Sequence, residues 1–308
     1  MLNYIVRRVL IGILTMLFLI TATFFLMRII PGSPFINDDE SVAAQKQYEQ
    51  LERKYGLDKP LLEQYGIYMN GLIHGDLGES LIRKGKTVVD IIGTTAPVTM
   101  RLGLTAFVFS MVVGIGLGIA AALSKRRWVN NFVMLLSTIG VSVPNFLLAV
   151  FLMLVFCVGL GLFPTIGLKT PLHYVLPTIA VSLHPIAMIS RLTRTSMMEV
   201  MRQDYMILAR SKGTPKWQVI IKHGLRNALL PVVTYAGPLI ASLLTGSFVV
   251  ETLFSIPGIG SEFVSSVTNR DYTLIMGLTI FMGFLVIVMN LLSDLVAAAV
   301  DPRIKLDK

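Results

Sequence analysis

The sequence has 308 residues, of which 54% are hydrophobic and 15% are charged, and its mean hydropathy is +0.71. Soluble globular domains carry about 25% charged residues, so this composition argues against a soluble enzyme and indicates a membrane protein. The formal net charge of +9 would suggest nucleic-acid binding in a soluble chain. Its meaning therefore depends on where the Lys and Arg residues lie.

The first apolar stretch resembles a secretory signal, because Arg7 and Arg8 precede the apolar run from Val9 to Met27. The apolar region of a signal usually has about 7 to 15 residues and ends at small residues suited to cleavage. This run is longer, and no such site lies near its end. We interpret it as an uncleaved first membrane span.

Six stretches are long and apolar enough to cross a membrane. Each helical residue adds about 1.5 Å against about 30 Å of hydrocarbon, so a span needs roughly 20 residues. The fourth stretch contains or adjoins His184, Pro185 and Arg191. We predict an all-α polytopic membrane protein with six transmembrane helices, over residues 9–30, 100–123, 132–162, 176–192, 229–250 and 273–300.

The positive charge gathers on one side of the predicted membrane. The side that holds both chain ends carries 16 of the 27 Lys and Arg residues against four acidic residues, while the opposite side has a net charge of −2. Cytoplasmic loops retain Lys and Arg, so we predict a multi-pass protein of the cytoplasmic (inner) membrane with both termini in the cytoplasm. Residues 31–97 then form a small extracytoplasmic subdomain between the first helix (1–30) and a five-helix core (98–308). The charge is an orientation signal, which points to membrane lipid and not to nucleic acid.

No catalytic, cofactor or metal site is expected in this chain. The four histidines are not spaced as metal ligands, the lone Cys157 lies in an apolar run, and Gly85-Lys86-Thr87 lacks the first glycine of a phosphate-binding loop. Two sets of residues within spans leave two interpretations open. His184 and Pro185 could line a pathway or form a bend packed against neighbouring helices, and Asp294 could serve a pathway or make a structural hydrogen bond.

The cytoplasmic loop 193–228 is the most informative segment. Apolar residues recur at mostly helical spacing before and after Gly213, which is expected to end the first helix in a left-handed conformation. Two short amphipathic helices would then project a compact knob into the cytoplasm. A basic loop could lie on anionic lipid instead, but apolar residues on a protruding helix pair favour a protein partner.

Motifs along the whole chain resemble the permease subunits of ABC importers, in the form found in oligopeptide and dipeptide systems. Within the loop, Ile207 and Leu208 stand where other importers have Glu-Ala, as in the peptide branch. The motifs that carry the resemblance are Arg28 to Pro34 (RIIPGSP), Tyr55 to Pro60 (YGLDKP), Gly75 to Ser80 (GDLGES), Ala209 to Gly213 (ARSKG), His223 to Pro231 (HGLRNALLP), Phe254 to Gly260 (FSIPGIG), Asn269 to Tyr272 (NRDY) and Asp301-Pro302-Arg303.

The resemblance implies a type I ABC importer permease fold and a defined set of partners. These are a second homologous permease, two ATP-binding subunits that hold ATP and Mg and hydrolyse the ATP, and an extracytoplasmic substrate-binding protein. The chain itself would be no enzyme and would hold no cofactor. It also implies that the loop docks the ATPase through Leu208, Ala209, Gly213 and Trp217, with polar contacts from Arg210 and Lys212, and that Pro257, Gly258 and Gly260 contact the binding protein or a gate.

Several alternatives remain at this point. The same architecture carries nickel chelates, glutathione or oligosaccharides in related importers. An ion-coupled secondary carrier would normally show paired buried charges or inverted repeats, and the sequence has one Asp inside a span and no repeat. A membrane-bound regulatory or scaffold protein could also present a cytoplasmic knob.

Overall fold

The computed structural model describes residues 2–29, 50, 53 and 56–300. Within these residues the chain is helical apart from turns, loops and one isolated β-bridge between Glu79 and Thr87. Five helices are long and apolar enough to cross a membrane, and counting one bent helix pair as a span gives six. Three expected motif segments lie wholly or partly outside the described residues: 30–34, Tyr55 and Asp301-Pro302-Arg303.

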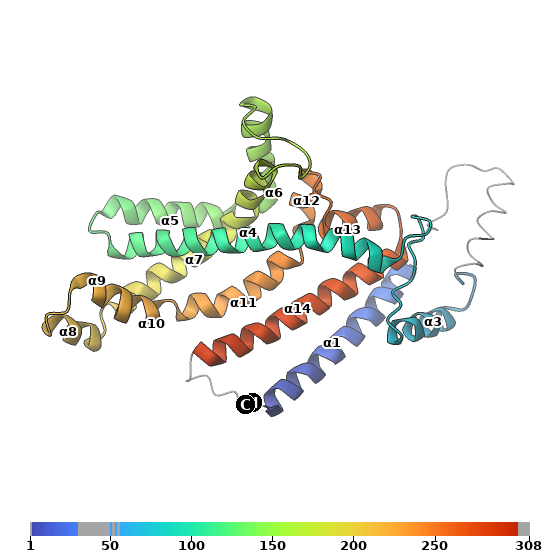
Figure 1. Cartoon of the computed structure of the whole chain (residues 1–308), viewed down its shortest axis with the longest axis horizontal. Coiled ribbons are helices and arrows are strands. Elements are labelled where there is room, and N and C mark those ends of the chain that lie inside the picture. The colour runs from blue at the N-terminus through green and yellow to red at the C-terminus, as the bar shows by residue number, and fades with distance from the viewer. Residues whose placement is uncertain (1, 30–49, 51–52, 54–55, 301–308) are drawn as a thin grey trace.

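The spanning helices are inclined rods that pack against one another (Figure 1). α4 contacts α7 and α11, α14 contacts α11 and α1, and α5 packs on α7. Five of the six predicted spans overlap continuous spans of the structure along nearly their whole length, and α11 and α12 together form the fifth of the predicted spans. The helices are α1 (Leu2–Ile29), α4 (Val88–Leu123), α5 (Arg127–Ser142), α7 (Leu172–Val200), α11 (Leu230–Leu244), α12 (Phe248–Leu253) and α14 (Tyr272–Val300).

The third predicted span, 132–162, is not one straight helix. α5 ends at Ser142, and α6 (Asn145–Leu152) continues into the π-helical turn η1 (Met153–Gly159) at an angle of 105°. The cause is local: a residue before proline is pushed out of the helical region, and Val143 accordingly has φ −86° and ψ 121° ahead of Pro144. In Figure 1, α6 points away from the layer formed by α4, α5 and α7.

α4 begins before the predicted start of its span, at Val88. Thr87 and Asp90 form a reciprocal cap, in which Asp90 N donates to Thr87 Oγ1 (3.1 Å) and Thr87 N donates to Asp90 Oδ2 (3.2 Å). Such a cap satisfies two backbone donors at a helix start. Residues 88–97, expected in the extracytoplasmic segment, are therefore the first turns of α4.

A small-residue contact brings α4 against α7. A Cβ atom on Gly118 would lie 2.5 Å from Thr193 Cβ, and one on Gly114 would lie 2.7 Å from Ile189 Cβ. Glycine at such positions lets two helix backbones approach closely, which supplies the van der Waals contact that holds helices together in lipid. This contact joins the predicted second and fourth spans.

The segment after the first span packs on the membrane helices. α3 (Leu61–Ile73) lies against α1 and α14, where Tyr65, Tyr68 and Met69 pack on Phe24 and its buried neighbours. Tyr65 OH lies 2.8 Å from Thr21 Oγ1. The described part of the segment between the first two spans is thus anchored on the spans and does not form a separate core.

Candidate functional site

Residues 193–200, expected as the start of the loop 193–228, are the last turns of α7, and the rest of the loop folds as two short helices, as predicted. α8 (Asp204–Ser211) is followed by a turn and by α9 (Lys216–Gln218), which runs on through η2 (Val219–Leu225) and α10 (Arg226–Ala228) into α11. Gly213 has φ +74°, and its N–H donates to Arg210 O (3.0 Å). The prediction of a left-handed Gly213 at the end of the first helix is confirmed.

One face of this helix pair fixes it to the membrane helices. Met206 of α8 and Val219 of η2 are buried, as is Met197 near the end of α7. A Cβ atom on Gly224 would lie 3.2 Å from Met197 Cε and 3.4 Å from Met206 Cε. The two short helices are therefore packed on the end of α7 and continue into α11.

The opposite face is apolar and exposed. Leu208 is 55% and Trp217 is 62% exposed, and Arg210, Lys212 and Gly213 are exposed as well, while Ala209 is half-buried. We call the face formed by these residues of the helix pair the knob face. The sequence reasoning missed two of its members, Ile207 and Ile221, which are also exposed. Ile221 follows Trp217 by one helical turn, a spacing that could have revealed it.

His184 and Pro185 lie beside a cavity of about 380 Å³ between α6, α7, α11 and the turn before α12. α7 continues through Pro185, which is buried, whereas His184 is half-buried. The cavity wall mixes apolar side chains with polar groups spaced around it. The polar lining residues are Asn145, His184, Tyr235, Ser242 and Ser247.

Beside this cavity, a buried carboxylate organises the segment that the sequence marked as Pro257-Gly258-Ile259-Gly260. Glu251 of α12 has no exposed surface. Its Oε2 accepts from Gly260 N (2.7 Å) and Ser261 N (3.2 Å) at the start of α13 (Ile259–Thr268), and its Oε1 accepts from Thr99 Oγ1 (3.1 Å) of α4. Negative charge is favourable at a helix N-terminus, so Glu251 holds α12, α13 and α4 together.

The glycines around Glu251 are required by its position. A Cβ atom on Gly258 would collide with Glu251 Oε2 and Thr99 Oγ1, and one on Gly246, which has φ +90°, would lie 2.5 Å from Glu251 Oε1. Gly258 and Gly260 are buried and Pro257 is exposed. Of the three residues expected at a binding-protein or gate contact, the two glycines thus form the interior of the segment and Pro257 its surface.

A second buried carboxylate ties the described part of the segment between the first two spans to α14. Asp271 precedes α14, and its oxygens accept from Ser80 Oγ, Leu81 N (3.1 Å) and Leu274 N (3.2 Å). Two motifs that are far apart in sequence, Gly75 to Ser80 and Asn269 to Tyr272, meet at this point.

Asp294 is paired with a cation near the other end of the same helix. Its Oδ2 lies 2.8 Å from Arg8 Nη2, which joins α14 to α1. Among the described residues, no group of three or more His, Cys, Asp or Glu side chains could hold a metal ion.

Comparisons with known proteins show the family of this sequence. The model of the binding-protein-dependent transport system inner membrane component matches residues 114–306, and the model of the N-terminal part of such membrane components matches residues 1–103. The chain belongs to this family. Its sequence is 44% identical over 308 residues to the dipeptide transport system permease protein DppB of Bacillus subtilis, covering 100% of this chain and 99% of that protein.

Other relatives of this permease agree with the assignment. It is 40% identical over 308 residues to the oligopeptide transport system permease protein OppB of Haemophilus influenzae, covering 99% of this chain and 100% of the relative. The methionine ABC transporter MetNI in an inward-facing form matches its fold with a TM-score of 0.54 at 18% identity, over 68% of this chain and 96% of that one. The predicted ABC importer permease fold is therefore confirmed.

Proposed function

We propose that this chain is the permease subunit of an ATP-driven importer of dipeptides or oligopeptides. The observation that carries the proposal is the end-to-end identity of 44% with a dipeptide permease, which extends through the cytoplasmic helix pair and the extracytoplasmic motifs. The partners would be a second homologous permease, two subunits that bind ATP and Mg and perform the hydrolysis, and an extracytoplasmic substrate-binding protein.

The knob face would be the surface on which one ATPase subunit docks. A protein anchored in lipid does not need exposed leucine and tryptophan in the water beyond the membrane, and large aromatic side chains dominate the energetics of protein interfaces. Leu208, Ala209, Gly213 and Trp217 would make the apolar contact, and Arg210 and Lys212 the polar one. Closure of the ATPase dimer would displace α7 and α11 because both are packed on the helix pair.

The cavity beside His184 would form part of the wall of the peptide pathway. Peptides of varied sequence share amide donors and acceptors, which Asn145, Tyr235, Ser242 and Ser247 can satisfy without selecting a side chain. Gly246 and Ser247 line this cavity, and Gly246 touches Glu251, so movement of α12 and α13 would alter the cavity directly. This gives the segment around Pro257, Gly258 and Gly260 a role as an extracytoplasmic gate.

In this proposal the knob face and both termini lie in the cytoplasm. The first helix (1–30), the extracytoplasmic segment (31–97) and the core (98–308) would then have separate tasks: anchoring, contact with the binding protein, and translocation. Asp294, paired with Arg8, would hold the first helix on the core and would not line the pathway.

Substrate competition tests the proposed function. The assembled importer, reconstituted with its binding protein in liposomes, should take up a labelled dipeptide, and excess unlabelled di- or oligopeptide should suppress the uptake. A nickel chelate, glutathione or an oligosaccharide should not compete. Uptake of one of these three compounds in place of peptide would assign the other cargo, and uptake driven by an ion gradient without ATP would assign a secondary carrier.

A further inference from the structure

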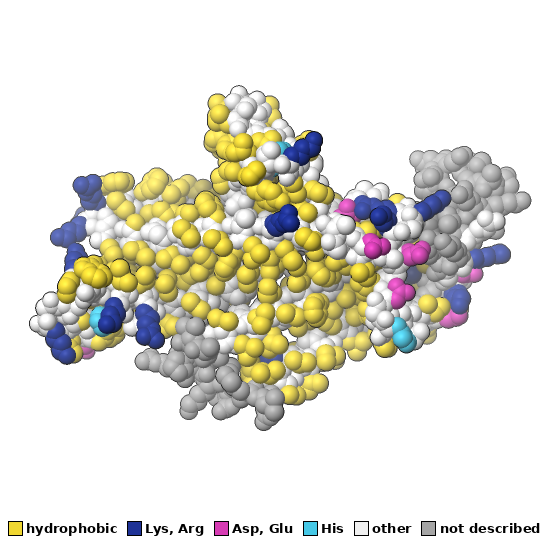
Figure 2. Space-filling view, viewed as in Figure 1, with side chains coloured by type: hydrophobic (Ala, Val, Ile, Leu, Met, Phe, Trp, Pro, Cys, Tyr) yellow, Lys and Arg dark blue, Asp and Glu magenta, His cyan; other side chains and the backbone are white. Residues whose placement is uncertain are grey.

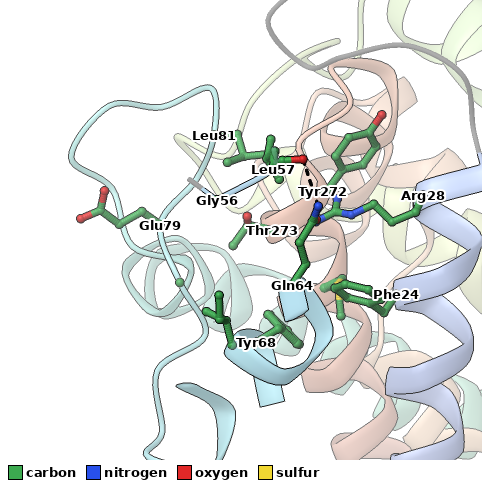
Figure 3. Close-up of a pocket in the computed structure, with 13 residues that line it drawn as sticks. Phe24, Arg28, Gly56, Leu57, Gln64, Tyr68, Glu79, Leu81, Tyr272 and Thr273 are labelled. Atoms are coloured by element: carbon green, nitrogen blue, oxygen red, sulfur yellow. Dashed lines mark hydrogen bonds between the residues drawn. The ribbon is translucent and has the colours of Figure 1, made fainter. Parts of the chain in front are cut away.

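A second cavity, of about 190 Å³, shares no lining residue with the one beside His184 and lies between α1, α3, α14 and the loop before α4 (Figure 3). Phe24 and Arg28 come from α1, Gln64 and Tyr68 from α3, and Tyr272 is the first residue of α14. No part of the mechanism proposed above uses this cavity.

Three buried polar atoms in its wall have no hydrogen-bond partner among the described residues: Arg28 Nε, Gln64 Oε1 and Tyr68 OH. Gln64 is only 8% exposed, and its amide nitrogen is fully used, because Nε2 donates to Leu57 O (3.0 Å) and Lys59 O (2.8 Å). Leaving a buried donor or acceptor unpaired is costly, and native structures contain few such atoms. Three of them around one cavity form a set of polar groups that a polar ligand could bind.

Arg28 is fixed in place without an acidic partner. Its guanidinium carbon lies 5.1 Å from the Phe24 ring centroid and 5.4 Å from that of Tyr272. The ion pairs among the described residues join Arg8 to Asp294, Lys59 to Glu63 and Arg83 to Glu262, and none of them involves Arg28. The cavity therefore offers a positive charge held by two aromatic rings.

The three atoms define the chemistry of the ligand. Arg28 Nε–H and the Tyr68 hydroxyl can both donate, which suits an oxyanion, whereas Gln64 Oε1 can only accept, which requires a donor on the same ligand. Burial raises the pKa of the Tyr68 phenol, so this hydroxyl keeps its proton at neutral pH.

The position of the cavity along the spans indicates where such a ligand would come from. Arg28 is the penultimate residue of the span Tyr4–Ile29, and Tyr272 is the first residue of the span Tyr272–Val296. The ends of spans mark the level of the lipid headgroups. The wall also includes the apolar side chains of Ile67, Leu81 and Met276. Glu79 lines it too, but its exposed carboxylate points away from Arg28 (Figure 3).

We propose that this cavity binds the headgroup of a phospholipid from the adjacent leaflet, with the phosphate against Arg28 and Tyr68 and an ammonium or hydroxyl donor against Gln64. The bound lipid would join α3 to α1 and α14. The proposal does not rest on peptide transport and holds for any cargo.

Lipid-dependent thermal stability of the full-length chain, purified in detergent with the subunits that co-purify with it, tests this proposal. Phosphatidylethanolamine or phosphatidylglycerol should raise the midpoint of unfolding in a saturable manner. Phosphatidylcholine, which lacks a donor, should act more weakly, and inorganic phosphate should have no effect. Tyr68→Phe and Arg28→Lys should each weaken the apparent lipid affinity about tenfold, because each removes one hydrogen bond to a charged group.

Tyr65→Phe on the same helix is the matched control, because Tyr65 bonds Thr21 and does not line the cavity. It should leave the lipid response unchanged. In the absence of lipid, Tyr68→Phe should instead raise the midpoint of unfolding, because it removes a buried hydroxyl that has no partner. A lipid response that is absent in the native chain, equal in Tyr68→Phe, or reproduced by inorganic phosphate alone would overturn the proposal.

Discussion

The carboxylate of Glu251 shows how single residues hold the proposed gate. Its three donors come from α4 and from the start of α13, so one side chain bonds segments that are 152 and 9 positions away in the chain. Thr99 is central, because its hydroxyl donates to Glu251 and accepts from Ile259 N (2.8 Å). Loss of the Thr99 hydroxyl would leave both groups short of a partner.

Thr99→Val should therefore lower the free energy of unfolding by about 1.5 to 3 kcal/mol, because it removes a hydrogen bond to a buried charged group. Thr99→Ser keeps the hydroxyl and should retain most of the stability. Chemical denaturation of the detergent-purified protein measures both. Thr105→Val is the control on the same helix, since the hydrogen bonds of Thr105 go to the carbonyls of Arg101 and Leu102 in its own helix and to the Thr178 hydroxyl at 3.5 Å. Equal stability of the Val and Ser variants at position 99 would contradict the role given to Glu251.

The sequence revealed the glycines of this segment but not their reason. The motif predicts that Pro257, Gly258 and Gly260 contact the binding protein or a gate, but nothing in the sequence points to Glu251. Backbone N–H groups that bond a buried carboxylate produce no pattern in the residue spacing or hydropathy of the sequence. The same holds for Asp271, whose motif was recognised but whose partner, Ser80, lies 191 positions away.

At the scale of elements, two glycines of α4 differ in how closely other atoms approach them. A Cβ atom on Gly118 would meet Thr193 and Ser190 O, whereas a Cβ atom on Gly116 would meet nothing within 4 Å. Gly118→Ala should destabilise the protein by about 1 to 3 kcal/mol through overpacking. Gly116→Ala should have little effect. If the two variants were equally stable in the same denaturation assay, this packing of α4 on α7 would be wrong.

Five spans could be predicted because long apolar runs leave few alternatives in a bilayer. The break after α5 was missed for a definable reason: a hydropathy window averages over Val143-Pro144, although a residue before proline disfavours a helix. The π-helical turn η1 has no comparable signal. By contrast, the left-handed conformation of Gly213 could be predicted from the sequence, because a left-handed helix end strongly favours glycine.

At the scale of the whole molecule, acidic and basic side chains are distributed unevenly between the two ends. In Figure 2, Lys and Arg side chains at the end formed by α8, α9 and the α4–α5 connection have few acidic neighbours, whereas most visible Asp and Glu side chains lie near the opposite end, mixed there with further Lys and Arg. This asymmetry is what the sequence predicted from the positions of the cations, and it supports the proposed orientation.

Cysteine labelling in intact cells tests that orientation. Cys157 is the only cysteine and is buried, so a Cys157→Ala background leaves no competing thiol. A membrane-impermeant maleimide should label Lys84→Cys, an exposed site in the loop before α4, from outside. Lys125→Cys, which is equally exposed between α4 and α5, should react only after the cells are opened. The reverse pattern would invert the topology.

The central claim is that ATP hydrolysis drives uptake through the knob face, and the two tryptophans provide its most direct test. Trp217 on the knob face is 62% exposed, and Trp128 at the start of α5 is 63% exposed. ATP-dependent uptake of a labelled dipeptide should be measured in proteoliposomes that contain the complete importer. Trp217→Ala should reduce this uptake at least tenfold by weakening ATPase docking, and Trp128→Ala should leave it near the native level. Equal uptake by the two variants, or native uptake that does not require ATP, would contradict the account.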